Sequence, residues 1–86
     1  MVINNPEALE NYIIFLTKYI NFLKDDKVKL ATTFQAVHKE WIDNVYDKID
    51  KNLRTLFKII DSKIDYLTEV VKELDKILYY LRKYLK

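Results

Sequence analysis

Apolar residues in the first half of the chain recur every seven positions, along two lines that lie four residues apart. The first line is aliphatic throughout and consists of Leu9, Leu16, Leu23, Leu30 and Val37. The second line consists of Ile13, Ile20, Lys27, Phe34 and Trp41. Two lines with this spacing occupy the a and d positions of a helical seam, so the pattern predicts one long amphipathic helix.

The second half of the chain repeats the seven-residue period in a different phase. Its two main lines are Tyr46, Leu53, Ile60, Leu67, Leu74, Leu81 and Ile49, Leu56, Lys63, Val70, Ile77, Tyr84. A third apolar line runs beside them and consists of Phe57, Ile64, Val71, Leu78 and Leu85. The pattern predicts a second long helix with a wide apolar stripe, whose seam is formed by the two main lines.

The two halves form either one continuous helix or a hairpin. On a common heptad frame their seams point about half a turn apart, so a straight helix would show them to opposite sides. A hairpin turns the two seams toward each other. We therefore predict a single all-α domain over residues 1–86. It is a two-helix antiparallel hairpin with helix 1 at about 6–38, a corner at about 39–43 and helix 2 at about 44–85.

Helix-start signals support these boundaries. Asn5 is a preferred N-cap residue, Pro6 suits the first helical position, and Glu7 favours the positive end of the helix dipole. Near the corner, Asp43 or Asn44 can cap the second helix in the same way. Both predicted helices therefore have a chemical reason to begin where the pattern begins.

One hairpin does not cover all of this apolar surface. Helix 2 is the longer helix, so residues from about Asp75 onward overhang the start of helix 1. The surface left uncovered consists of Tyr12, Phe15, Tyr19, Phe22, Phe57, Ile64, Val71, Leu78, Leu81, Tyr84 and Leu85. Because large exposed apolar surfaces mark interfaces, we predict a four-helix-bundle dimer. The alternative is a monomer whose terminal aromatic side chains stack on one another.

The composition excludes most loop-based chemistry. The 86 residues include no glycine and no cysteine. Phosphate-binding loops and nucleophile elbows need glycine, and disulfides or thiolate metal sites need cysteine. The single histidine, His38, has Glu40, Asp43 and Asp47 near it in the sequence, but a lone histidine at a corner is more often a solvated or capping residue than a metal ligand. Ser62 has no base near it. We therefore expect no enzyme activity, no cofactor and no metal.

The charge pattern gives no reason to expect nucleic acid or lipid as partners. The formal net charge is +2, and the two signs are interleaved along the chain. Arg82, Lys83 and Lys86 form a small basic cluster that suits the negative end of a helix dipole. No apolar run approaches the roughly 20 residues of a membrane span. We expect a cytoplasmic protein, with export by a route that lacks a cleaved signal peptide as the alternative.

The corner contains the only tryptophan, in the sequence Trp41-Ile42-Asp43. A tryptophan corner between two long amphipathic helices, after a Pro6-Glu7 start, resembles the WXG (ESAT-like) family of bacterial type VII secretion. The resemblance covers the layout of most of the chain, with Asp43 in place of the family's glycine. The family's export signal, Tyr-x-x-x-Asp/Glu after helix 2, does not occur here. The resemblance implies a divergent member or the half of a pair that lacks the signal.

These features predict a non-enzymatic interaction module. The resemblance implies a type VII secretion substrate, or a chaperone-like partner of a larger secreted effector. Its partner would be a second copy, another small helical protein or the helical targeting region of that effector. Two alternatives remain: a hairpin subunit of a helical filament, similar to a type III needle, and a small immunity or antitoxin-type binding protein.

Overall fold

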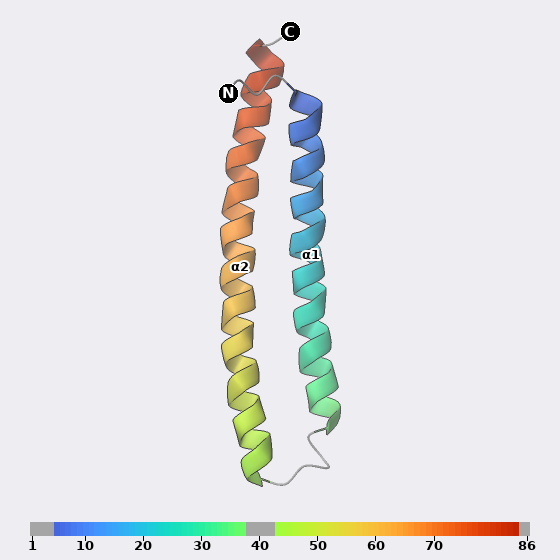
Figure 1. Cartoon of the computed structure of the whole chain (residues 1–86), viewed down its shortest axis with the longest axis vertical. Helices are drawn as coiled ribbons and strands as arrows, with labels where there is room; N and C mark the ends of the chain where they lie inside the picture. Colours follow the sequence, from blue (N-terminus) through green and yellow to red (C-terminus); the bar gives the residue numbers. More distant parts are fainter. Residues whose placement is uncertain (1–4, 38–42, 85–86) are drawn as a thin grey trace.

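The chain forms two long antiparallel helices in the computed structural model, which describes residues 5–37 and 43–84. Helix α1 spans Pro6–Val37 and helix α2 spans Asp43–Tyr84. They lie side by side along a rod that measures 64 × 17 × 17 Å, and the C-terminal end of α1 lies at the same end of the rod as the N-terminal end of α2 (Figure 1). The predicted all-α antiparallel hairpin is confirmed, and the single continuous helix is excluded.

Helix α1 begins with the cap that the sequence predicts. The side-chain oxygen Oδ1 of Asn5 accepts a hydrogen bond from the backbone N–H of Ala8 at 3.0 Å. The carbonyl of Asn5 accepts a second bond, from the N–H of Leu9 at 3.3 Å. Pro6 is the first helical residue, where its missing N–H leaves no bond unmade. The Asn5 cap therefore fixes the point at which the helix starts.

The core lies along the contact between the two helices, which we call the seam. Its best-buried side chains retain 6–9% of their surface exposed and are Ile13, Leu16, Ile20, Leu23, Ile60 and Leu78. The four from α1 belong to the two lines that the sequence assigns to its seam. At the corner end, the rings of Phe34 and Tyr46 stack with centroids 4.8 Å apart.

The seam of α2 differs from the prediction. The Tyr46 line lies in the seam as expected, but its partner is the third line, of which Leu78 is buried and Phe57 half-buried. The Ile49 line lies at the edge of the seam instead: Leu56, Ile77 and Tyr84 are exposed, whereas Ile49 and Val70 are half-buried. The predicted seam was therefore wrong in one of its two lines. The physical reason is Lys63: it belongs to the Ile49 line, whereas the third line is apolar throughout.

The overhang of α2 is shorter than expected. Arg82 forms an ion pair with Glu10 in the second turn of α1, so the two helices are still in contact beyond Asp75. Leu78 is buried in this stretch and Leu81 is half-buried. Only the last turns of α2 pass the start of α1 (Figure 1).

Candidate protein interface

The aromatic residues predicted as an interface on α1 form one stripe along its flank. Tyr12, Phe15 and Phe22 are exposed, and Tyr19 is half-buried. Their spacing of three, four and three residues places them on one side of the helix. The rings of Tyr19 and Phe22 stack with centroids 6.5 Å apart. The structure therefore brings these four side chains together as the sequence suggests.

The interface residues predicted on α2 lie mostly in the seam. Leu78 is buried, and the side chains that are half-buried are Phe57, Ile64, Val71 and Leu81. Phe57, Ile64, Val71 and Leu78 pack toward α1 because the third line took the place of the Ile49 line. Leu81, on the Tyr46 line, packs toward α1 because the overhang is short. The prediction that the hairpin leaves these five uncovered is therefore wrong. Tyr84 is exposed as predicted. Leu85 lies outside the described residues.

A different set of α2 residues forms the exposed apolar surface. Their exposed fractions range from 40% to 68%, and they are Val45, Leu56, Ile59, Tyr66, Ile77, Tyr80 and Tyr84. The predicted interface included only the last of these. A signal was present, because these positions are separated by three or four residues or by sums of such steps, as in a second seam. Only Lys63 and Glu73 bring charge into this stripe.

One contact shows that the two stripes lie on the same side of the hairpin. Lys63, within the α2 stripe, donates a hydrogen bond from Nζ to the hydroxyl of Tyr19 on α1 at 2.6 Å. The same ammonium lies 4.9 Å from the centre of the Tyr19 ring, within cation–π range. The stripes thus join into one surface, which we call the apolar face. It comprises Tyr12, Phe15, Tyr19 and Phe22 with the seven exposed α2 residues named above.

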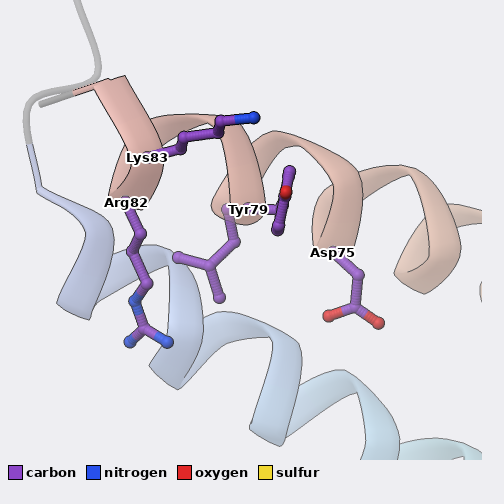
Figure 2. A pocket seen from close by; sticks show the side chains of 5 residues that line it. Asp75, Tyr79, Arg82 and Lys83 are labelled. Carbon is purple, nitrogen blue, oxygen red and sulfur yellow. The ribbon is translucent and has the colours of Figure 1, made fainter.

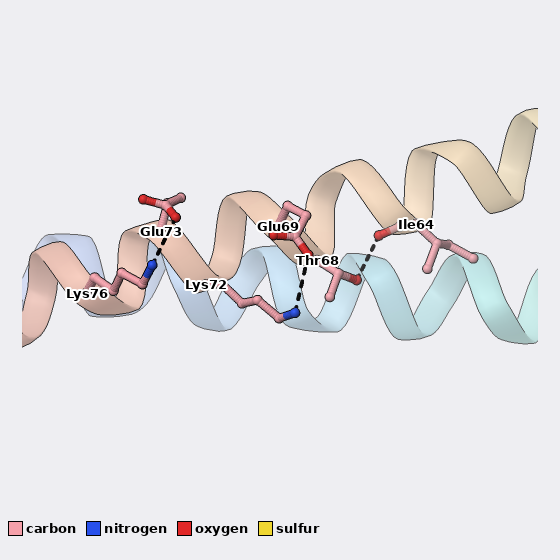
Figure 3. Close-up of polar contacts among 6 residues, drawn as sticks. All are labelled: Ile64, Thr68, Glu69, Lys72, Glu73 and Lys76. Carbon is pink, nitrogen blue, oxygen red and sulfur yellow. Dashed lines mark hydrogen bonds and ion pairs between the residues drawn. The ribbon is translucent and has the colours of Figure 1, made fainter.

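The opposite flank of the hairpin is polar, and two ion pairs join α1 to α2 along it. Glu10 pairs with Arg82 there, and Lys27 pairs with Asp61 at 2.7 Å. Along the exposed surface of α2, Glu69 pairs with Lys72 and Glu73 with Lys76, each at 3.2 Å (Figure 3). We call the side that carries the two cross-helix ion pairs the polar flank.

One arginine of the corner end has a shifted pKa. The guanidinium of Arg54 donates a hydrogen bond from Nε to the Asp50 carboxylate at 2.8 Å. This bond, together with the attraction between the two charges, raises the pKa of Arg54. Since arginine is already protonated throughout the physiological range, the shift leaves its charge there unchanged.

The described residues that line a shallow hollow near the C-terminal end of α2 all belong to this helix. The hollow measures about 530 Å³, and these residues are Asp75, Leu78, Tyr79, Arg82 and Lys83. Arg82 extends toward α1, whereas Lys83 points away from it (Figure 2). Small-molecule sites enclose most of their ligand. This hollow is open and shallow, so the apolar face is the stronger candidate site.

The core of the hairpin consists of a single seam between two helices. Among the side chains of residues 5–36 and 45–84, the best-buried one, Leu16, is still 6% exposed. A pair of helices has one seam, and each residue in it keeps a side that no third helix covers. A chain of this size buries only about 60% of its unfolded surface. A second layer packed on the apolar face would therefore bury side chains that the hairpin alone leaves open.

Several sequence predictions fall on the corner and the ends of the chain. Trp41 and His38 lie outside the described residues, and Asp43 is the first residue of α2. In the described ranges, no group of three or more potential metal ligands lies together. Neither helix, within those ranges, contains a stretch long and apolar enough to cross a membrane. The chain matches no protein-family model, no curated protein and no solved structure.

Proposed function

We propose that this protein is a non-enzymatic interaction module that docks its apolar face against helices of a partner. The observation that carries the proposal is the Lys63–Tyr19 contact, because it joins the aromatic stripe of α1 and the stripe of α2 into one surface. Ten of the thirteen exposed large hydrophobic side chains in the described part of the chain belong to this face. The other three are Ile14, Val28 and Tyr79.

The free energy available from this face is large enough for association. Full burial of one large apolar side chain contributes roughly 1.5–3 kcal/mol. Association costs an estimated 4–15 kcal/mol in lost freedom of motion. Ten side chains of the face are 40–68% exposed, so docking adds roughly half of the full-burial contribution for each, and the cost is offset when most of the face docks at once.

The specific form we propose is a WXG-like type VII secretion substrate or chaperone-like partner of a larger effector. The hairpin layout supports it, together with the tryptophan at the corner in the sequence. The test is export: in the native host, the protein or an effector encoded beside it should leave the cell only while the secretion ATPase is functional. Export of both that is unaffected by loss of the ATPase would contradict this form, and the docking proposal would stand.

Site-specific photo-cross-linking tests the docking proposal. A benzophenone amino acid replaces Phe15 on the apolar face or its neighbour Ile14, which is also exposed but points away from the face. We expect a discrete adduct of defined mass in the native host from position 15 and none from position 14. Identical adduct patterns from both positions, or none from either, would overturn the proposal. Mass spectrometry of the adduct then identifies the partner.

A further inference from the structure

We infer that the occupant of the apolar face is a second copy of this chain, in antiparallel orientation. The inference rests on the proposed docking function and names its partner. In this arrangement a two-fold axis crosses the helices beside the Lys63–Tyr19 pair. Helix α1 then packs on α1 of the second copy, helix α2 packs on α2, and the two corners lie at opposite ends of a four-helix bundle.

The positions of the two stripes along the rod support this symmetry. The α1 stripe runs from Tyr12 to Phe22, so its midpoint lies between Phe15 and Tyr19. The α2 stripe runs from Val45 to Tyr84, so its midpoint lies just beyond Lys63. The hydrogen bond between Lys63 and Tyr19 places both midpoints at the same level of the hairpin. A two-fold axis at this level therefore superimposes each stripe on its own copy, as an isologous interface requires.

The size of the face also matches what a stable dimer needs. One side of a rod 64 Å long and 17 Å wide has a footprint of roughly 1,000 Å². Specific interfaces bury about 800 Å² on each partner. A single partner helix would cover only one of the two stripes, whereas a second hairpin covers both.

The charges that continue the α1 flank toward the corner favour this orientation over the other symmetric one. If both corners lay at the same end, α1 would pack on α2 of the second copy. Asp26 and Lys29, which continue the α1 flank toward the corner, would then lie against Leu56 and Ile49, and burial of unpaired charge is costly. In the antiparallel arrangement these two residues lie past the end of the aromatic stripe, opposite Ala8 and Asn5 of the second copy.

In this arrangement Lys63 fixes the register between the two copies. It sits close to the axis, where its ammonium lies beside Tyr66 of the second copy while it keeps its hydrogen bond to Tyr19. A polar residue inside an apolar seam fixes register, because other registers place its charge against apolar side chains of the second copy. Lys63 would therefore select the pairing in which both copies place it near the centre.

Disulfide cross-linking tests the orientation, and the chain offers a clean background because it contains no cysteine. At 1.5 Å per residue, Tyr66 lies about 5 Å along the axis from its own copy, and Tyr80 lies on the order of 45 Å from its own copy. We expect Tyr66→Cys to form a covalent dimer readily and Tyr80→Cys not to exceed the collisional background set by Tyr79→Cys. A mixture of Ile77→Cys and Asn52→Cys chains should give the mixed dimer.

The outcomes separate this inference from the proposed function. Sedimentation equilibrium of the unmodified chain should give a dimer that does not grow further with concentration. A monomer at all concentrations, a polymer, or Tyr80→Cys dimers that form as fast as Tyr66→Cys dimers would each overturn the inference. An adduct at position 15 with a different protein, together with a monomeric purified chain, would overturn it and leave the docking function standing. Circular dichroism of each variant shows that the exposed substitutions keep the helices.

Discussion

The two flanks of the hairpin are built from the same two helices but differ in their contacts. One flank carries ion pairs between the helices, and the other is largely apolar and exposed. On the polar flank, Glu10 and Lys27 each find an opposite charge on α2. On the apolar face, Lys63 and Tyr19 make the one cross-helix hydrogen bond that the structure describes there, and the side chains around them face solvent. The comparison teaches that this fold pairs charges between its helices on one flank and leaves its surplus apolar surface exposed on the other, where we propose that a partner docks.

The largest loss of stability is expected from a substitution in the seam, which lies between the two flanks. Leu16 is 6% exposed, and Leu16→Ala should lower the free energy of unfolding by about 2–5 kcal/mol, which includes the cost of the cavity. Circular dichroism during denaturant unfolding measures this. The control is Ile14→Ala on the exposed surface, and equal losses from the two variants would contradict the assignment of the seam.

A smaller effect is expected when one charge is placed on the apolar face. Tyr80 and Tyr79 are adjacent and similarly exposed, at 58% and 62%, but only Tyr80 belongs to the face. Tyr80→Glu should weaken self-association by about tenfold to a hundredfold, since it removes about 1.5–3 kcal/mol of burial. Tyr79→Glu should leave association unchanged. Sedimentation equilibrium compares the two, and equal weakening would mean that the flanks do not differ as we propose.

Loss of the Tyr19 hydroxyl should lower the stability of the hairpin modestly. Tyr19→Phe keeps the ring but removes the hydrogen bond to Lys63, and a net loss of about 1 kcal/mol is expected from thermal unfolding. Lys63→Met provides the comparison, because it removes the charge as well as the bond. If Lys63 fixes the register, Lys63→Met should also allow cysteine cross-links in registers that the parent chain excludes.

The smallest effect is expected on the polar flank. The side chains of Lys27 and Asp61 are 33% and 52% exposed, and exposed ion pairs contribute about 0.2–1 kcal/mol. Asp61→Asn should lower the free energy of unfolding by no more than this amount. The difference from the parent chain should shrink in 1 M salt, because salt screens the pair. A loss that persists at high salt would indicate a packing role for Asp61 instead.

The sequence was sufficient for the helices and their arrangement because those depend on local signals. Asn5 and Pro6 specify the start of α1, and its seven-residue lines specify its seam. For α2 the pattern was ambiguous, because apolar lines lie on both sides of the Tyr46 line. The two lines differ by one polar residue, Lys63, and the fold places it on the flank beside Tyr19. That choice depends on a residue 44 positions away in the chain, which periodicity alone does not reveal.

The cross-helix contacts also imply an order of folding. Their sequence separations grow from 34 residues for Lys27–Asp61 to 44 for Tyr19–Lys63 and 72 for Glu10–Arg82. Each doubling of a closed loop costs about 0.6 kcal/mol of chain entropy. Because the loop closed by Glu10 and Arg82 is about twice as long as the loop closed by Lys27 and Asp61, we expect the contacts nearest the corner to form first. An antiparallel second copy would lay its own corner half over the far end, so each copy would cover the part of the other that closes last.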